Sequence, residues 1–152
     1  MPRKKSQTSV SRPAEDRLAK AKARLCARLA IEKKAFGISV LHVGAVSPIA
    51  EYFVICSGRS VRQTRAIAEH IQTALKVQRR ETPLGVEGEA EGVWILLDYD
   101  DVVIHVFYEP TRAYYALESL WSDAPRLRDS ALLKAEREAL AGSAQEEGDW
   151  ED

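Results

Sequence analysis

The sequence predicts one α/β (α+β) domain in which helices flank a mixed β-sheet. Two runs rich in β-branched residues, 93–98 and 102–106, flank a short acidic turn, as expected of a β-hairpin. A strand, a helix and a further strand precede this hairpin, and that order implies a right-handed crossover and a parallel strand pair. Parallel and antiparallel pairing therefore combine in one sheet. A chain of 152 residues is long enough to bury one core.

The first third of the chain predicts a helix followed by two strands. Residues 15–36 carry apolar side chains at helical spacing, and Gly37 is a typical residue just after a helix end. Residues 38–46 follow as a strand, which Pro48 ends because proline cannot donate to a strand ladder. Residues 52–56 form a continuous apolar run, typical of a strand buried on both faces.

Three further segments complete the predicted core. Residues 61–78 form a helix with Ser60 as its N-cap, and 84–87 form a short strand before the hairpin. After the hairpin, Thr111 caps a helix over 112–121. With few helices available for the strands, one face of the sheet is expected to be poorly covered, and such a face is a natural place for a partner.

Composition divides the chain into four parts. Residues 1–13 are basic and 142–152 are acidic, and both are polar and unpatterned, so we expect disordered tails there. The domain is expected to span residues 14–126, followed by a C-terminal helix at 127–141, which is best patterned from Ser130 onward.

Charge, hydropathy and cysteine usage exclude several classes of protein. A net charge of −1 argues against nucleic-acid binding by bulk electrostatics. No run of about 18 apolar residues is present, which predicts no membrane span. Cys26 and Cys56 lack CxxC spacing and lie in patterned segments, so buried, reduced thiols are expected. With no hydrophobic signal-peptide core, we expect a cytoplasmic protein.

The acidic residues of the hairpin admit two interpretations. Asp98, Asp100, Asp101 and His105 resemble a metal or nucleotidyl-transfer site, since carboxylates two apart on a strand share a face. However, aspartate also favours turns, where its side chain bonds nearby backbone. The turn interpretation is favoured, and no metal ligands or catalytic residues are predicted.

Two other candidate sites are better explained as structure. Residues 57–60 combine a glycine with a helix N-terminus, which could hold a phosphate, but neither phosphate-loop fingerprint is present. The three histidines (His42, His70 and His105) lack the spacing of a hydrolase triad.

Trp94 is either a core residue or an interface anchor. Tryptophan, tyrosine and arginine dominate binding hot spots, because they bury a large area and have few rotors to freeze. Strand alternation places Leu96 and Asp98 on the same face as Trp94. We expect His105 to orient Asp98 if the hairpin register places them opposite. Asp98 could then accept a bond from a basic residue of a partner.

Three blocks of residues resemble a known family. The first block is Tyr52-Phe53-Val54-Ile55-Cys56-Ser57-Gly58 with Ser60, Arg62 and Gln63. The second is Val86-Glu87-Gly88 with the run from Gly92 to Phe107, and the third is Arg112, Tyr114-Tyr115, Leu117-Glu118 and Leu120-Trp121. Over 18–126 the chain resembles the ribosomal silencing factor family, also called Iojap-like. It departs at Ala50-Glu51, where the family more often has Thr-Asp.

This resemblance implies a fold like that of nucleotidyltransferases without catalytic residues, and therefore no enzyme activity and no cofactor. It implies binding to the large ribosomal subunit through ribosomal protein fourteen on the intersubunit face, which prevents the small subunit from joining and represses translation. It also implies a homodimer in isolation. The expected partner-binding residues are Trp94, Leu96, Asp98, His105, Arg112 and Tyr115.

Two alternatives belong to other functional classes. One is a nucleotidyltransferase that holds a divalent metal with Asp98, Asp100 and Glu87. The other is contact with ribosomal RNA through the basic arm and the edge from Arg59 to Arg65.

Overall fold

The computed structural model describes residues 13–150, with side chains described from 15 to 142. The predicted basic arm lies outside the described residues except for Pro13, where the first helix begins. None of the described helices is long and apolar enough to span a membrane. The elements in chain order are α2 (Pro13–Glu32), β1 (Phe36–Leu41), η1 (Val43–Ala45), β2 (Tyr52–Gly58), α3 (Val61–Arg79), β3 (Gly85–Glu87), β4 (Trp94–Asp98), β5 (Val102–Tyr108), α4 (Glu109–Tyr115), α5 (Leu117–Leu120) and α6 (Ser130–Trp150).

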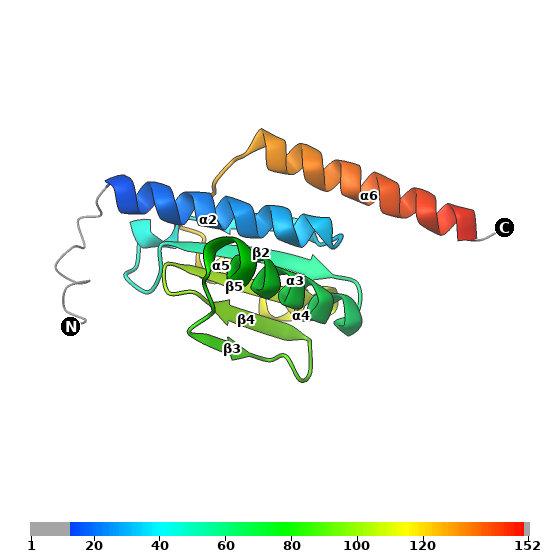
Figure 1. Cartoon of the computed structure of the whole chain (residues 1–152), viewed down its shortest axis with the longest axis horizontal. Helices are drawn as coiled ribbons and strands as arrows, with labels where there is room; N and C mark the ends of the chain where they lie inside the picture. The colour runs from blue at the N-terminus through cyan, green and yellow to red at the C-terminus, as the bar shows by residue number, and fades with distance from the viewer. Residues whose placement is uncertain (1–12, 151–152) are drawn as a thin grey trace.

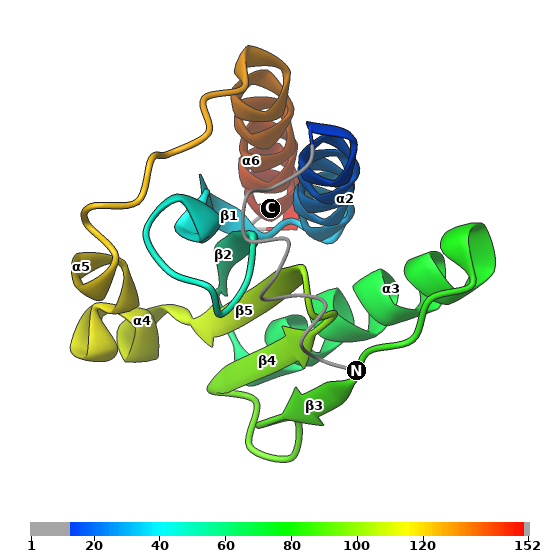
Figure 2. The same ribbon diagram turned by 90° about the vertical axis from the view of Figure 1, so that its left-hand side faces the viewer.

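The five strands form one mixed sheet in the order β1-β2-β5-β4-β3 (Figure 2). β2 and β5 pair in parallel, and every other pair is antiparallel. The predicted mixed sheet and its hairpin are therefore confirmed. A parallel pair is present, but it joins β2 to β5, the second strand of the hairpin, and not to β3, which directly follows α3. The hairpin register places Trp94 opposite Phe107 and Leu96 opposite His105.

One face of the sheet is covered by α2 and α3, with α6 lying beside α2 (Figures 1 and 2). Alternate residues of the strands enter this layer, including Val54, Ile95 and Ile104, which are fully buried. The inner strand β2 is buried along its whole length, as its continuous apolar run predicts. Cys26 and Cys56 are buried free thiols, in agreement with the sequence.

The opposite face of the sheet is only partly covered. A second apolar cluster lies there, where Phe53, Ile55 and Phe107 pack with Leu117 of α5 and with Trp121. Figure 2 shows α4 and α5 on this side, close to one end of the strands. On this same side, no described helix covers β3 or the rest of β4. This open region is the poorly covered face that the helix count predicts.

Two predicted element boundaries are wrong. The first helix ends at Glu32 rather than at residue 36, because Lys34 turns left-handed with φ 68° and Phe36 already begins β1. The predicted strand over 38–46 ends at Leu41, and a 3₁₀ turn follows.

The prediction of one helix over 112–121 is also wrong, because this segment is divided between two helices. Ala116 adopts the left-handed conformation with φ 48° and separates α4 from α5. α4 begins at Glu109, so Thr111 is not its cap; Pro110 suits the first turn, where no amide donor is needed. α6 begins at Ser130 as predicted but continues to Trp150 rather than ending at residue 141. Glutamate, glutamine and alanine are favourable helix residues, so charge and polarity alone do not mark a helix end.

Candidate partner-binding surface

The outer side of β4 carries three half-buried side chains in a row. Trp94, Leu96 and Asp98 are half-buried, whereas Ile95 and Leu97 between them are fully buried against the helices. The predicted alternation is confirmed, because successive strand residues point to opposite faces. We call Trp94, Leu96 and Asp98 the hairpin row.

Trp94 is held at a fixed orientation by its neighbours. Its ring lies 4.8 Å from the ring of Phe107 and 5.1 Å from that of Tyr115, measured between centroids. Its indole Nε1 donates a hydrogen bond of 3.1 Å to Nδ1 of His105. Few rotamers then remain to be frozen when a partner covers the half-exposed indole, which favours binding.

His105 lies beneath Trp94 and is 4% exposed. Burial lowers the pKa of its imidazole to about 4, so the ring is neutral at pH 7. Since Nδ1 accepts the indole hydrogen bond, the proton resides on Nε2, which has no hydrogen-bond partner among the described residues. The expectation that His105 orients Asp98 is wrong: the register places Asp98 opposite Val103, and His105 orients Trp94 instead.

This buried histidine predicts a stability that falls in mild acid. The unfolded chain takes up a proton near pH 6.5, whereas the folded chain resists it down to about pH 4. Stability from the neutral ring is therefore full above pH 6.5 and is lost as pH falls towards 4. We expect a loss of about 2 kcal/mol between pH 7 and pH 5. Urea unfolding of the wild type and of His105→Gln at both pH values measures this loss. The free energy of unfolding of the variant should not fall by this amount, and an equal fall in both proteins would contradict the role of His105.

The hairpin acids serve the turn and an ion pair. Oδ1 of Asp98 accepts a hydrogen bond of 2.8 Å from the amide of Asp100, whose φ is 75°. Asp101 binds the ammonium group of Lys22 at 2.7 Å. Glu87 lies on β3 opposite Leu96. These contacts match the turn interpretation, because aspartate bonds its own backbone in tight turns.

Arg112 and Tyr115 differ in accessibility. The guanidinium of Arg112 donates to the carbonyl of Gly37 at 2.7 Å and to Oγ of Ser57 at 2.8 Å, and it pairs with Glu118 at 3.0 Å. Hydrogen bonds from Ser39 and Arg112 and the nearby guanidinium charges outweigh burial and lower the pKa of Glu118. Arg112 thus fastens α4 and α5 to the sheet, whereas Tyr115 is 53% exposed beside Trp94.

Phe107 and Tyr114 complete the surroundings of the hairpin row, although neither is among the expected partner-binding residues. Phe107 supports the indole from β5, and Tyr114 packs edge-on against Tyr115 at 5.0 Å. Alternation along β5 could have found Phe107, since it shares the face of His105.

The turn at residues 57–60 caps α3. Oγ of Ser60 accepts a hydrogen bond of 3.1 Å from the amide of Gln63, as the predicted N-cap requires. The Gln63 side chain accepts a hydrogen bond from the amide of Arg59 at 2.6 Å. Both interactions satisfy backbone donors at the helix start and favour the structural interpretation of this turn.

Comparison with known proteins places this arrangement in a family. A family model described as "Ribosomal silencing factor during starvation" matches residues 16–151. "Ribosomal silencing factor RsfS" of Bacillus subtilis is 44% identical over 97 residues, which are 62% of this chain and 79% of that protein. "Mitochondrial assembly of ribosomal large subunit protein 1" of Mus musculus is 32% identical over 93 residues, 60% of this chain and 41% of that protein.

A solved structure has the same fold. The crystal structure of a protein from Chromobacterium violaceum matches with a TM-score of 0.65 and 30% identity, covering 68% of this chain and 85% of the other. The family match also extends past residue 126, where the resemblance seen in the sequence ends, and takes in α6. The chain therefore belongs to the ribosomal silencing factor family, whose members act in translation regulation.

Proposed function

We propose that this protein represses translation by binding the large ribosomal subunit through the hairpin row. The observation that carries the proposal is Trp94, a half-exposed indole fixed by His105, Phe107 and Tyr115 on the open face of the sheet. Rigid aromatic side chains at the centre of an interface supply most of its binding energy. Family membership supports the ribosome as the target.

The proposed contact is ribosomal protein fourteen on the intersubunit face of the large subunit. Trp94 and Leu96 offer an apolar contact area, and Tyr115 extends it. The carboxylate of Asp98 lies at the end of the row and accepts a hydrogen bond from a basic residue of the partner. The name of the mouse relative, which refers to assembly of the large subunit, supports the choice of subunit. The proposal places the protein in the cytoplasm with its ribosomes.

The proposed mechanism is steric and assigns no catalytic residue. A protein of 152 residues that occupies the intersubunit face prevents the small subunit from docking there. His105 and Arg112 act as positioning residues. His105 orients the indole, and Arg112 holds α4, which ends at Tyr115, against the sheet. Asp98 is bonded to the hairpin turn, an arrangement that does not favour the nucleotidyltransferase alternative.

Sucrose-gradient sedimentation tests the proposal. Purified protein should comigrate with large subunits but not with small subunits, and its addition before mixing should reduce the whole-ribosome peak. Normal whole-ribosome formation with the protein bound would contradict the occlusion mechanism. Binding to bare ribosomal RNA that falls steeply with salt would favour the RNA alternative instead. The homodimer stays a prediction, which sedimentation velocity of the free protein tests.

A further inference from the structure

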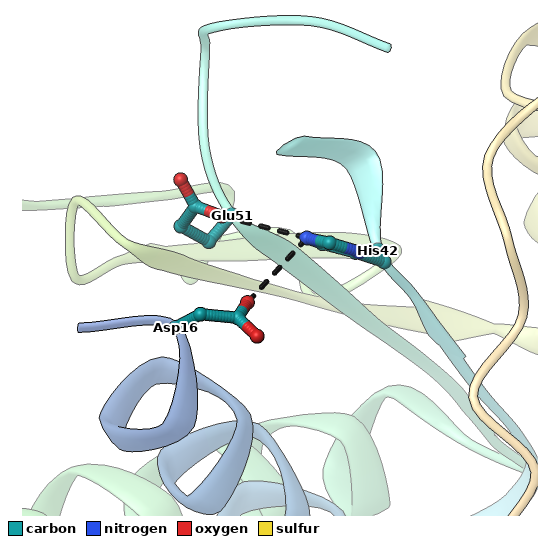
Figure 3. Close-up of side chains that lie close together, drawn as sticks. All are labelled: Asp16, His42 and Glu51. Carbon is teal, nitrogen blue, oxygen red and sulfur yellow. Dashed lines mark ion pairs between the residues drawn. The ribbon is translucent and has the colours of Figure 1, made fainter. Parts of the chain in front are cut away.

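Three side chains from different parts of the chain converge away from the hairpin row. Asp16 lies in the first turn of α2, His42 follows β1, and Glu51 precedes β2. Figure 3 shows both carboxylates directed at the imidazole edge. One nitrogen or oxygen from each residue lies within 4.8 Å of the other two. Each of the three residues is partly exposed, so ions can enter from solvent.

The distances are those of metal ligands rather than of hydrogen bonds. Nε2 of His42 lies 3.6 Å from Oδ1 of Asp16 and 3.5 Å from Oε1 of Glu51. Hydrogen bonds from nitrogen to oxygen are shorter, about 2.7–3.2 Å. Two ligand atoms that share a tetrahedral Zn²⁺ at about 2.0–2.2 Å lie about 3.4 Å apart. The two distances from His42 match this ligand-to-ligand spacing, and the two carboxylate oxygens lie within 4.8 Å of each other.

Neighbouring groups hold the three side chains in position. The Tyr52 ring stacks on His42 at 4.7 Å, with 15° between the planes. Its hydroxyl donates a hydrogen bond of 3.2 Å to Oδ1 of Asp16. A side chain at Gly44 would meet Oε1 of Glu51 at 2.5 Å, so glycine leaves room for that carboxylate. Such outer contacts orient the ligands of metal sites in proteins.

We propose that Asp16, His42 and Glu51 bind one divalent first-row transition ion, best represented by Zn²⁺. An imidazole with two carboxylates suits this class, because the imidazole disfavours Mg²⁺ and Ca²⁺ while three protein ligands leave a fourth position for water. The ion joins the start of α2 to the connection between β1 and β2. It thereby stabilises the helix that covers the sheet. The role concerns the fold and is independent of the proposed ribosome contact.

Titration calorimetry of tag-free, chelator-treated protein with ZnCl₂ tests the site. We expect one ion per chain, together with a rise in the thermal unfolding temperature. Asp16→Asn, His42→Asn and Glu51→Gln should each weaken binding at least 10-fold, since loss of an outer contact alone weakens metal binding roughly 10- to 100-fold. The matched control is His70→Asn: His70 pairs with Glu32 at 2.8 Å but belongs to no group of three potential metal ligands among the described residues. This control should bind Zn²⁺ like the wild type.

Several results would overturn the assignment. They are the absence of saturable Zn²⁺ binding, wild-type affinity in Glu51→Gln or His42→Asn, and Mg²⁺ binding as tight as Zn²⁺ binding. Loss of binding in His70→Asn would do the same. Circular dichroism checks that each variant folds. If His42→Asn does not fold, the two carboxylate variants decide, since each keeps the size of its side chain and removes one charged ligand.

Discussion

Trp94→Ala is expected to weaken binding to the large ribosomal subunit about 100-fold, or by about 3 kcal/mol, as at a typical hot spot. The indole is half-buried in the free protein, and its remaining surface is available to a partner. Truncation removes that contact area and leaves Nδ1 of His105 without its donor. Co-sedimentation with large subunits over a range of protein concentrations measures the loss.

Two variants separate contact from folding in this experiment. Val77→Ala removes an apolar side chain that is 76% exposed on α3, so it should bind like the wild type. Trp94→Phe keeps an aromatic ring but loses the indole donor, and it should fall between the wild type and Trp94→Ala. Wild-type affinity of a folded Trp94→Ala would exclude the hairpin row as the anchor. If Trp94→Ala unfolds while Trp94→Phe folds and binds fully, Trp94 is a core residue.

Local patterns predicted most of the fold. The apolar run of β2, the alternation in β4 and the N-cap Ser60 each reflect one residue type in one local environment, so the sequence was sufficient. The predicted helix boundaries were wrong where a residue adopted a backbone conformation that its type rarely adopts. Lys34 and Ala116 both turn left-handed with φ 68° and 48°, and neither residue type signals such a turn.

The candidate site was predictable only where it depended on a local pattern. Strand alternation gave the shared face of Trp94, Leu96 and Asp98 without any knowledge of the packing. The partner of His105 depended on hairpin register, and register followed from a turn whose geometry the sequence left open. The cluster of Asp16, His42 and Glu51 joins three elements that are distant in the chain, and no spacing rule connects them.

Lys22 presents a similar long-range contact, and its replacement has a large expected effect on stability. Its side chain is 5% exposed, and its ammonium group lies 2.6 Å from Glu81 and 2.7 Å from Asp101. It therefore joins α2 to the chain after α3 and to the hairpin turn. Lys22→Met should lower the free energy of unfolding by about 2 kcal/mol, since Asp101 loses this cation while Glu81, also about a third exposed, keeps Arg79. Urea unfolding at pH 7 measures this.

Lys76→Met is the matched control, because Lys76 is exposed on α3 and its removal should change stability by less than about 0.5 kcal/mol. A Lys22→Met variant as stable as the wild type would show that methionine packing compensates for the lost ion pairs. Measuring Lys22→Met in a Glu81→Gln background separates the loss of the ion pair from the effect of methionine packing. If the pair stabilises the fold, Lys22→Met must cost less in that background than in the wild type.

The pH dependence of the Lys22 effect identifies its electrostatic part. Hydrogen bonds from Lys22 and Arg79 outweigh burial and lower the pKa of Glu81 from 4.5, while the two carboxylates outweigh burial and raise the pKa of Lys22 from 10.5. The contribution of Glu81 is present above pH 4.5 and is lost as pH falls through its lowered pKa. That of Lys22 is present below pH 10.5 and is lost as pH rises through its raised pKa. The stability difference between wild type and Lys22→Met should therefore be constant near pH 7 and shrink at both extremes, whereas a loss of packing alone would not change with pH.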